Sequence, residues 1–598
     1  MILVFGGTTE GRVAVRTLDE SGQPYFYSTR GTQQQVECKH GTHIAGAMTA
    51  ETMTHFCREH GIRLIVDAAH PFASQLHETI GAVASDLNLP VVRLERHYHT
   101  GPDSGIVWCD TYADAVARML ADGITRLLAL TGVQTIGKLR GFWQERDCWF
   151  RILDREESFA KARESGFPAD RLCLYSPDED IAELIRATGA DGVITKESGD
   201  SGGFEEKLEG AREAGVTLYV VRRPKLPPEF ITVTGEHGLR REVQRLVPDY
   251  FPLRTGFTTG ACATAAATAA ALALFRGEIA EDVKFEIPSG EIMTMPIHSV
   301  TVTDRAATAS VIKDAGDDPD VTDGYRIVVT LAKADHAGIR FIGGEGVGTV
   351  TLPGVGLDIG EPAINPVPRR MIAQALQAFG AEGLDVTVSV PGGAELAAKT
   401  FNPRIGIVGG ISIIGTSGIV RPFSHEAFVE SMRREMEVAL ALGCERIVVN
   451  SGAKSERFVK ALYRALPPQA FIHYGNAVGD IMELAAQLNV KQLTIGLMIG
   501  KAVKLAEGNT DTHSHKVTVN REFLASIALE CDCPDTTIEA INQINMAREL
   551  WTLPRTEATD RFFGEILRRC RQVCAAIYPG NLEALLITDE GKILYRLQ

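Results

Sequence analysis

Two glycine-rich turns that each lead directly into a helix divide this chain into two parts. The first turn follows the apolar residues 2–5, in the sequence MILVFGGTTEGR. The second lies at Pro248–Gly260, where PDYFPLRTGFTTG runs into the small-residue segment ACATAAATAAALALF. A glycine turn at the N-terminus of a helix is a common anion-binding arrangement, so each turn is typical of the start of a catalytic domain. The sequence therefore predicts two catalytic units fused end to end.

The size and composition agree with a multidomain globular protein. The 598 residues are too many for one core, and 45% hydrophobic with 23% charged residues is ordinary for such a chain. The net charge of −15 makes non-specific nucleic-acid binding an unexpected function. The eleven scattered cysteines favour a reducing compartment. We find no signal peptide and no membrane-spanning pattern, so we expect a cytoplasmic protein that binds no membrane.

Short apolar strands alternate with helices through the first part of the chain. This pattern predicts a doubly wound, Rossmann-like α/β sheet. A break near Arg140–Cys148 suggests two lobes with a cleft between them. The expected strands are residues 2–5, Tyr25–Ser28, Leu64–Asp67, Val91–Leu94, Arg126–Leu130, Gly192–Thr195 and Thr217–Val221, with helices at Gly11–Glu20, Pro71–Ser85 and Phe204–Ala214.

The turn after the first strand is the candidate dinucleotide site. It does not match G-x-G-x-x-G, and an ordinary tight turn is the alternative, but a phosphate could rest on the following helix N-terminus. Arg30 ends the next strand, where NAD sites carry an acid and a base suits a 2′-phosphate, so NADPH is favoured over NADH. The predicted cofactor-binding residues are Gly6, Gly7, Thr8, Thr9, Glu10, Gly11 and Arg30.

Two further loops follow strands whose carboxyl ends should border the same site. His70 precedes a proline, so its backbone is extended and its ring could enter a cleft, although a structural histidine is the alternative. Lys196 stands among glycines in a loop that suits an anion, with a solvated lysine as the alternative. We predict catalytic roles for His70 and Lys196, and substrate binding by Ser198 and Gly199.

Several segments of this part resemble one enzyme family. GGTTEGR, STRG, DAAHPFA, RLER, LTGVQTI and ITKESGDSGGFEEKLEGAREAGV, in this order, are similar to the precorrin-6A reductases of cobalamin biosynthesis. The resemblance covers nearly all of residues 1–247. It implies a two-lobed reductase that reduces one double bond of a methylated tetrapyrrole with NADPH or NADH.

The second part begins with a β-rich region. Expected strands are Val283–Ile287, Ile292–Ile297, Ala307–Ile312 and Tyr325–Leu331. The acidic segment Asp314–Asp323 lacks the spacing of an EF-hand, so we expect a solvated loop rather than a cation site.

An α/β pattern follows from Arg404. We expect strands at Ile405–Val408, Arg446–Val449, Ala470–His473 and Gln492–Met498, each closed by a small polar or glycine-rich loop. These loops should share one edge of a parallel sheet and one crevice, unless they are simply turns that favour Gly and Asn. We predict a catalytic role for Asn476. The predicted cofactor-binding residues are Gly410, Gly415, Thr416, Ser417, Gly418, Asn450, Gly475 and Asp480, and the predicted substrate-binding residues are Arg254, Thr258, Thr259, Arg421 and Lys501.

This part resembles the cobalt-precorrin-5B C1-methyltransferases. RTGFTTGACA, IKDAGDDPDVTDG, GGEGVGTVT, GIVGGISIIGTSGIVRPFS, NSG, YGNAVGD and GKAVKLAEGNTDTHS carry the resemblance from about Leu253 to near the C-terminus. It implies an α+β methyltransferase unit with S-adenosylmethionine as cofactor and a cobalt-precorrin as the small-molecule partner. The family does not have the usual tetrapyrrole methylase fold and offers no standard signature for S-adenosylmethionine, so the methyl-donor residues above come from loop position alone.

The two resemblances imply methylation and then reduction of one macrocycle, with units at residues 1–247 and 253–598. The prolines of Pro224–Pro252 suggest a semi-rigid linker. A homo-oligomer is possible. Two alternatives stay open: a reductase whose C-terminal half only presents the substrate, and a non-catalytic tetrapyrrole carrier. We predict no protein metal site, because the candidate pairs lack a third ligand at motif spacing: His97 and His99, His513 and His515, Cys531 and Cys533, and Cys570 and Cys574.

Overall fold

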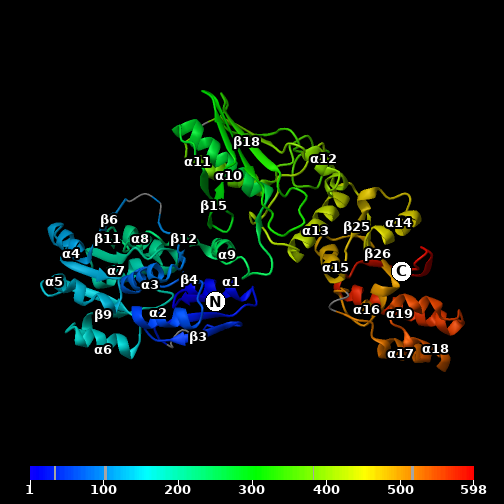
Figure 1. Cartoon of the computed structure of the whole chain (residues 1–598), viewed down its shortest axis with the longest axis horizontal. Helices are drawn as coiled ribbons and strands as arrows, with labels where there is room; N and C mark the ends of the chain where they lie inside the picture. Colours follow the sequence, from blue (N-terminus) through cyan, green and yellow to red (C-terminus); the bar gives the residue numbers. More distant parts are fainter. Residues whose placement is uncertain (32–35, 100, 102–103, 381–382, 514–516) are drawn as a thin grey trace. The chain divides into compact units, whose positions relative to one another are not determined.

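A computed structural model describes residues 1–31, 36–99, 101, 104–380, 383–513 and 517–598 (Figure 1). The chain forms two compact units. The N-terminal unit comprises Met1–Arg254 with Glu291–Met293, and the C-terminal unit comprises Thr255–Gly290 with Thr294–Gln598.

The N-terminal unit contains two parallel sheets in its described residues. The first has the strand order β12 (Ile231–Thr234), β5 (Val91–Glu95), β4 (Leu64–Asp67), β1 (Ile2–Phe5), β2 (Tyr25–Thr29) and β3 (Gly41–Ala45). Strands β1 and β4 are fully buried, as expected for a sheet covered on both faces. The accompanying helices are α1 (Thr9–Asp19), α2 (Ala50–Glu59), α3 (Ser74–Leu87) and α9 (Gly235–Leu246).

The second sheet repeats this architecture. Its order is β6 (Ile106–Cys109), β11 (Thr217–Val221), β10 (Gly192–Lys196), β7 (Arg126–Ala129), β8 (Asp147–Ile152) and β9 (Leu172–Leu174). Its helices are α4 (Tyr112–Ala121), α5 (Arg140–Trp143), α6 (Glu156–Glu164), α7 (Ile181–Thr188) and α8 (Phe204–Glu213). The doubly wound two-lobed fold predicted from the sequence is confirmed.

Two expectations for this unit are wrong. The break at Arg140–Cys148 lies within the second lobe, because β8 pairs with β7 there. The chain instead passes to the second sheet between β5 and β6, and returns to the first after β11. The expected linker Pro224–Pro252 contains β12, which pairs with β5, and α9, whose Leu239 and Val243 are buried in the core of the first lobe.

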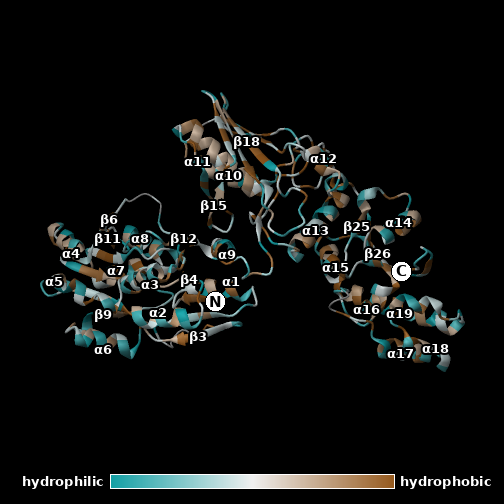
Figure 2. Cartoon of the chain, in the orientation of Figure 1, coloured by the Kyte–Doolittle hydropathy of each residue, from teal (hydrophilic) through white to brown (hydrophobic). Residues whose placement is uncertain are grey.

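The C-terminal unit begins with a β-rich part built around one helix. Every residue of α10 (Thr259–Ala271) is buried. The span Thr259–Arg276 is apolar and long enough for a membrane helix, but it forms the core and packs against α11 (Pro366–Gln377). The neighbouring sheet has the order β16 (Ser299–Val302), β17 (Ala306–Ile312), β18 (Arg326–Lys333), β21 (Gly383–Ser389) and β19 (Gly338–Gly343). Figure 2 shows the apolar residues of β18 in brown.

Short strand pairs complete this part. They are β14 (Asp282–Glu286) with β15 (Ile292–Pro296), β13 (Gly256–Phe257) with β23 (Ile419–Val420), and β20 (Thr349–Val350) with β22 (Ile407–Val408). The short helix α12 (Gly393–Ala397) follows β21.

The last part is an α/β layer with the strand order β25 (Phe471–His473), β24 (Arg446–Asn450), β26 (Gln492–Met498), β27 (Asn581–Ile587) and β28 (Ile593–Leu597). All neighbours are parallel except β27 and β28. The helices are α13 (His425–Ala441), α14 (Ala453–Leu462), α15 (Val478–Gln487), α16 (Ile499–Ala506), α17 (Arg521–Glu530), α18 (Asp535–Gln543) and α19 (Glu557–Ile577).

One expectation for this layer is wrong. The segment Ile405–Val408 does not provide its first parallel strand, because β22 is two residues long and pairs antiparallel with β20 in the β-rich part. The apolar run that follows holds several glycines and forms isolated bridges at Ile411 and Ile413 instead of a strand. The loops after β24, β25 and β26 do share one sheet edge, as predicted, but the loop at Gly409–Gly418 belongs to another layer.

Candidate functional sites

The predicted dinucleotide turn lies between β1 and α1. Thr8 is the N-cap of α1, and its hydroxyl accepts a hydrogen bond from the N–H of Gly11. Gly7 has a φ of +98°, and a Cβ built there would meet no atom within 4 Å, so the backbone is open to a ligand. Gly6 packs against the ring of Tyr27, whose hydroxyl accepts from the N–H of Gly7. The turn therefore has a packed inner side and an open outer side at a helix N-terminus.

Arg30 lies directly after β2, the strand beside β1, and is exposed. The two strands are in parallel register, with Phe5 opposite Ser28, so the turn and Arg30 lie at one sheet edge. Thr9, predicted with them, is the first residue of α1. This arrangement can hold a pyrophosphate on the turn and an anionic group near Arg30.

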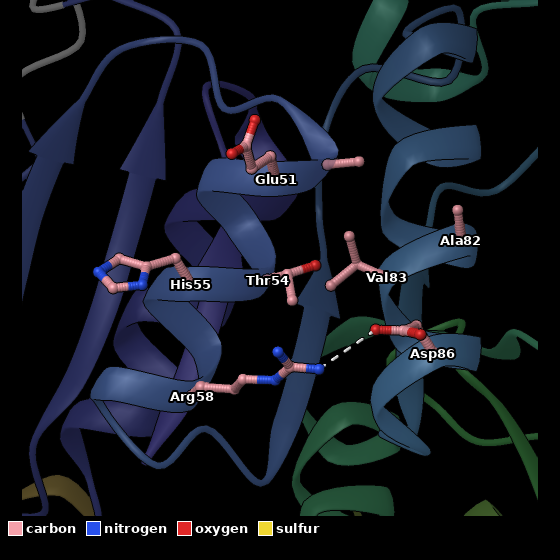
Figure 3. Close-up of a pocket in the computed structure, with 8 residues that line it drawn as sticks. Glu51, Thr54, His55, Arg58, Ala82, Val83 and Asp86 are labelled. Carbon is pink, nitrogen blue, oxygen red and sulfur yellow. Dashed lines mark ion pairs between the residues drawn. The ribbon is translucent and has the colours of Figure 1, made fainter.

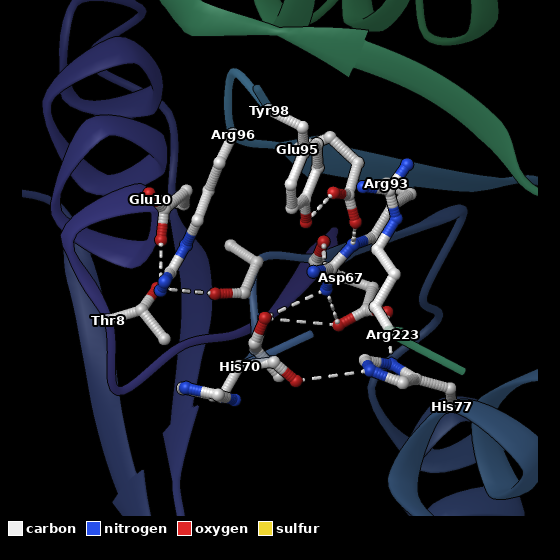
Figure 4. A network of polar contacts seen from close by, with 12 residues as sticks. Thr8, Glu10, Asp67, His70, His77, Arg93, Glu95, Arg96, Tyr98 and Arg223 are labelled. Carbon is white, nitrogen blue, oxygen red and sulfur yellow. Dashed lines mark hydrogen bonds and ion pairs between the residues drawn. The ribbon is translucent and has the colours of Figure 1, made fainter. Parts of the chain in front are cut away.

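Glu10 makes contacts that the sequence did not suggest. Its carboxylate lies 2.9 Å from the guanidinium of Arg96 and accepts from the hydroxyl of Ser201 at 2.6 Å (Figure 4). Arg96 also donates to the carbonyl oxygen of Ser198. Glu10 and Arg96 both belong to the first lobe and are buried, so they form a desolvated ion pair next to the turn. Their hydrogen bonds to Ser198 and Ser201 join this pair to the loop after β10 of the second lobe.

A second buried network lies beside this pair (Figure 4). The guanidinium of Arg93 contacts Asp67 at 3.0 Å and Glu95 at 2.6 Å, and it is 1% exposed. Asp67 also pairs with His77 at 2.7 Å, and the other ring nitrogen of His77 lies 3.2 Å from the carbonyl oxygen of His70. The network therefore fixes the loop that carries His70.

His70 and Lys196 both lie near the ring of Phe72. The ring centroids of His70 and Phe72 are 6.0 Å apart, and the ammonium of Lys196 is 5.5 Å from the centroid of Phe72. Partial desolvation and the charges of Arg96 and Lys196 lower the pKa of His70 to about 4, even though the residue as a whole is exposed to solvent. Its Nδ1 accepts from the N–H of Phe72, so the proton of the neutral ring is on Nε2.

Lys196 is the more capable proton donor of the two. Burial and the nearby charge of Lys138 lower the pKa of Lys196 to about 8. Its ammonium is therefore still mostly protonated at neutral pH but gives up a proton more readily than an ordinary lysine. The following loop is held in place, because Gly199 packs against the carbonyl oxygen of His97 and Ser198 donates to Gly202.

In the C-terminal unit the second glycine turn is tied to the Gly409–Gly418 loop. Thr258 caps α10, and its N–H donates to the carbonyl oxygen of Gly418. The hydroxyl of Thr259 accepts from the N–H of Ile414 at 2.9 Å. Both threonines are buried and hold the loop. Of the predicted residues in the loop, Gly410 is packed against the carbonyl oxygen of Gly346, Gly415 lies against Thr258, and Thr416 and Ser417 are exposed.

Three loops meet at the carboxyl edge of the last sheet. Asn450 is fully buried and serves the loop itself, since its Oδ1 accepts from Gly452 and Ser455. Lys501 extends from the start of α16 to the loop after β25, where its Nζ lies 2.6 Å from the carbonyl oxygen of Gly475. It also donates to the side chain of Asn476 in the same loop.

The other predicted residues lie around these loops. Asp480 is in the first turn of α15 and its Oδ1 lies 2.9 Å from Nε2 of His425 on α13. Arg421 directly follows β23 and is exposed. Arg254 is the residue at which the N-terminal unit ends, so the structure groups it apart from Thr258. His515 lies outside the described residues.

A surface groove between α2 and α3 contains none of the predicted residues (Figure 3). An ion pair of 3.5 Å between Arg58 and Asp86 crosses it. The lining residues are Ala50, Glu51, Thr54, His55, Arg58, Ala82, Val83 and Asp86.

Sequence reasoning missed three contributors to these sites. Arg96 was visible only as part of a motif, because its partners Glu10 and Ser198 are far from it in the chain. Phe72 is two residues after His70, and this closeness in the sequence was the available signal for it. Phe428 lies in α13 and packs against Gly475, since a Cβ on Gly475 would be 3.2 Å from its ring. Because Phe428 and Gly475 are far apart in the chain, no sequence pattern indicated that contact.

Known proteins resemble both units. The chain is 41% identical over 335 residues to the cobalt-precorrin-5B C(1)-methyltransferase of Geobacillus thermodenitrificans, a match that covers 55% of this chain and 90% of that protein. The corresponding protein of Prosthecochloris aestuarii is 42% identical over 354 residues, covering 57% of this chain and 96% of the relative. The chain belongs to the cobalt-precorrin-5B C(1)-methyltransferase family.

The family models match the same two parts of the chain for which the sequence suggested a reductase and a methyltransferase. The CbiD model matches residues 248–422, and the model of the CbiD C-terminal domain matches residues 511–597. The model of the precorrin-6x reductase CbiJ/CobK matches residues 1–240. A solved structure, CobK precorrin-6A reductase, is 22% identical, covers 41% of this chain and 97% of its own, and has a TM-score of 0.34. Both resemblances are thus confirmed, and the chain is a fused enzyme of cobalamin biosynthesis with a methyltransferase unit and a reductase unit.

Proposed function

We propose that the fused enzyme carries out two consecutive steps on one macrocycle. The methyltransferase unit methylates C1 of cobalt-precorrin-5B with S-adenosylmethionine, and the reductase unit reduces the resulting cobalt-precorrin-6A to cobalt-precorrin-6B with NADPH. The observation that carries this proposal is that one chain holds the reductase match at residues 1–240 and the CbiD matches at residues 248–422 and 511–597. We also expect a cytoplasmic location for an enzyme of this kind.

The residues of the reductase unit suit a dinucleotide. The open backbone at Gly7 and the helix N-terminus after Thr8 would hold the pyrophosphate, with Gly6, Thr9, Glu10 and Gly11 shaping the turn. Arg30 would contact the 2′-phosphate, which favours NADPH over NADH. Bound cofactor would supply the hydride, and the chain must supply a proton.

We assign that proton to the ammonium of Lys196. Reduction of a ring double bond adds a hydride and a proton, and a donor with a pKa of about 8 is suited to neutral pH. Nε2–H of His70 would donate a hydrogen bond that orients the substrate, since the ring is neutral. Ser198 and Gly199 would border the macrocycle next to Lys196.

The methyltransferase unit offers a backbone-lined edge for the methyl donor. A Cβ at Gly452 or Gly500 would meet no atom within 4 Å, so a ligand can approach the loops after β24 and β26 closely. Gly475 and Asn476, in the loop after β25, are held by Lys501 from the start of α16, and methyl transfer depends on such positioning. We propose that Asn476 orients the reacting centre. The remaining proposed ligand residues are Gly410, Gly415, Thr416, Ser417, Gly418 and Asp480 for the donor, and Thr258, Thr259, Arg421 and Lys501 for the substrate carboxylates. Asn450 would shape the loop after β24 from inside, through its bonds to Gly452 and Ser455.

Omitting one cofactor at a time tests this proposal. Cobalt-precorrin-5B incubated with S-adenosylmethionine alone should stop at the methylated product, and later addition of NADPH should reduce it. Purified cobalt-precorrin-6A should be reduced without S-adenosylmethionine. If the intact chain never methylates but still reduces cobalt-precorrin-6A, the C-terminal unit only presents the substrate. If it retains the pigment and changes it in neither incubation, the chain is a carrier.

A further inference from the structure

Phe423 in the methyltransferase unit combines an unusual backbone with an unusual exposure. Its φ is +54°, in a region that residues other than glycine rarely adopt. The residue is also 72% exposed to solvent. The N–H of Phe423 donates to a carboxylate oxygen of Asp318 at 3.2 Å, which helps to hold this conformation. A strained backbone that presents a large aromatic ring to solvent needs a reason outside the fold.

Local helix chemistry does not supply that reason. Phe423 precedes Ser424, the N-cap of α13, and Phe428 is four residues after the cap. Apolar residues at these two positions usually pack together as a hydrophobic staple. Within the described residues, however, the ring of Phe423 makes no aromatic or cation–π contact, and it remains exposed. The strain therefore turns the ring away from the contact that would stabilise the helix.

The position of Phe423 connects it to the methyl-transfer loops. Two residues later, His425 lies 2.9 Å from Asp480, at the start of α15 (helices α13 and α15 in Figure 1). Phe428, in the first turns of the same helix, packs against Gly475, whose neighbour Asn476 contacts Lys501. The beginning of α13 thus borders the loop that carries Asn476.

The other side of Phe423 leads to the second glycine turn. Arg421 is the first residue after β23. Strand β23 pairs with β13, and β13 ends at Phe257, the residue before Thr258. The N–H of Thr258 in turn contacts the carbonyl oxygen of Gly418. Phe423 is therefore connected on one side to the second glycine turn at Thr258 and on the other to the loop that carries Asn476. The basic residue Arg421 is two positions before it.

We propose that Phe423 is a substrate-stacking residue, whose ring covers one face of the tetrapyrrole while it is methylated. This inference rests on the proposed function, which makes a conjugated macrocycle with peripheral carboxylates the substrate. An aromatic side chain stacks on such a flat surface, and Arg421 is placed to meet a carboxylate at its rim.

A second protein is the less suitable occupant. An interface core needs a contiguous apolar patch, whereas Phe423 is flanked in sequence by Arg421, Ser424, His425 and Glu426 and is held by Asp318. One large aromatic ring among charged groups matches a planar, charged small molecule better than a protein surface.

The backbone at Phe423 allows a test that does not depend on a destabilised variant. Phe423→Gly removes the ring but prefers the same positive φ, so its melting temperature should equal or exceed that of the wild type. Phe423→Tyr keeps a stacking ring. Ile279→Ala, at another exposed apolar residue of the same unit, is the matched control. Binding of cobalt-precorrin-5B is followed by its absorbance change, and KM is measured for both substrates of methylation.

We expect Phe423→Gly to weaken binding of cobalt-precorrin-5B and raise its KM about tenfold, the effect of losing one aromatic contact with its buried area. The KM for S-adenosylmethionine, and the behaviour of Phe423→Tyr and Ile279→Ala, should stay near the wild type. Unchanged tetrapyrrole binding in a folded Phe423→Gly variant would overturn the inference. So would a change in sedimentation without a change in KM, which would indicate a second copy of the chain. If wild type binds the pigment but does not methylate it, the proposed chemistry fails, while the binding comparison still decides the role of Phe423.

Discussion

The Nζ of Lys501 lies 2.6 Å from the carbonyl oxygen of Gly475, so a lysine at the start of α16 holds the loop at the end of β25. The same ammonium also donates to Asn476 and to Thr512. These three contacts together use all three N–H donors of the ammonium. Burial and the nearby charge of Lys504 lower the pKa of Lys501 to about 8. Lys501 therefore fixes the position of Asn476 in addition to any contact with a substrate carboxylate.

Replacing this lysine should impair methylation specifically. Lys501→Met keeps the length of the side chain but removes the contacts to Gly475 and Asn476. We expect methyl transfer to fall about a hundredfold, the cost of misplacing a reacting group by about 1 Å. Steady-state methylation, measured with reduction of cobalt-precorrin-6A in parallel, checks this. Lys491→Met, at an exposed lysine before β26, is the control. Loss of both activities in Lys501→Met would indicate a folding defect and contradict the local role.

The rate of reduction should depend on the protonation of Lys196. Because the protonated ammonium is the proposed acid, the rate should fall as pH rises through about 8. Lys196→Met should remove most of the activity at every pH. Lys138→Met is the informative variant, since the charge of Lys138 helps to lower the pKa of Lys196. It should move the fall in rate to higher pH. A pH–rate profile that is the same in wild type and Lys138→Met would argue against Lys196 as the acid.

Arg30 should select between the two nicotinamide cofactors. Its exposed side chain follows β2, beside the glycine turn. Arg30→Ala should raise the KM for NADPH about tenfold to a hundredfold, because a hydrogen bond to a charged group contributes about 1.5–3 kcal/mol. The KM for NADH should change little. Equal losses with both cofactors would remove Arg30 from the 2′-phosphate site.

The end of the reductase unit should lie after Arg254 rather than near Asp249. Tyr250 and Phe251 are 6% and 4% exposed and belong to the core of the first lobe, with Leu239 and Val243. A fragment ending at Asp249 loses both rings, each worth about 3–5 kcal/mol when removed from a core. We expect residues 1–249 to be insoluble or to unfold at much lower urea than residues 1–254. Phe251→Ala in the full chain should show the same weakness. Equal stability of the two fragments would place the boundary before Tyr250.

The sequence predicted the positions of most helices and strands, but it did not predict which strands pair across long stretches of the chain. Strands such as Leu64–Asp67 and Thr217–Val221 were placed correctly because their buried apolar residues are contiguous. Strand β3 was missed because most of its residues are exposed and it lacks that pattern. Strand β6 pairs with β11 in the second sheet, and β12 pairs with β5 in the first. Both pairings join residues far apart in the chain, and no local sequence pattern encodes them.

The same limit applies to the sites. The loops at Asn450, Gly475 and Lys501 could be grouped from the sequence, because parallel strands end at one sheet edge. The direct contact of Lys501 with Asn476, and the ion pair of Glu10 with Arg96, join residues far apart in the chain. The exposure of Phe423 goes with a positive φ that its side chain disfavours, and no pattern in the sequence indicates either property.

Mass spectrometry of the tetrapyrrole is the most direct test of two activities in one chain. Cobalt-precorrin-5B is incubated with the intact protein, S-adenosylmethionine and NADPH, and samples are taken over time. The account predicts that the pigment first gains the mass of one methylene group and then the mass of two hydrogens. Reduction that occurs before or without methylation, or a pigment whose mass never changes, would contradict it.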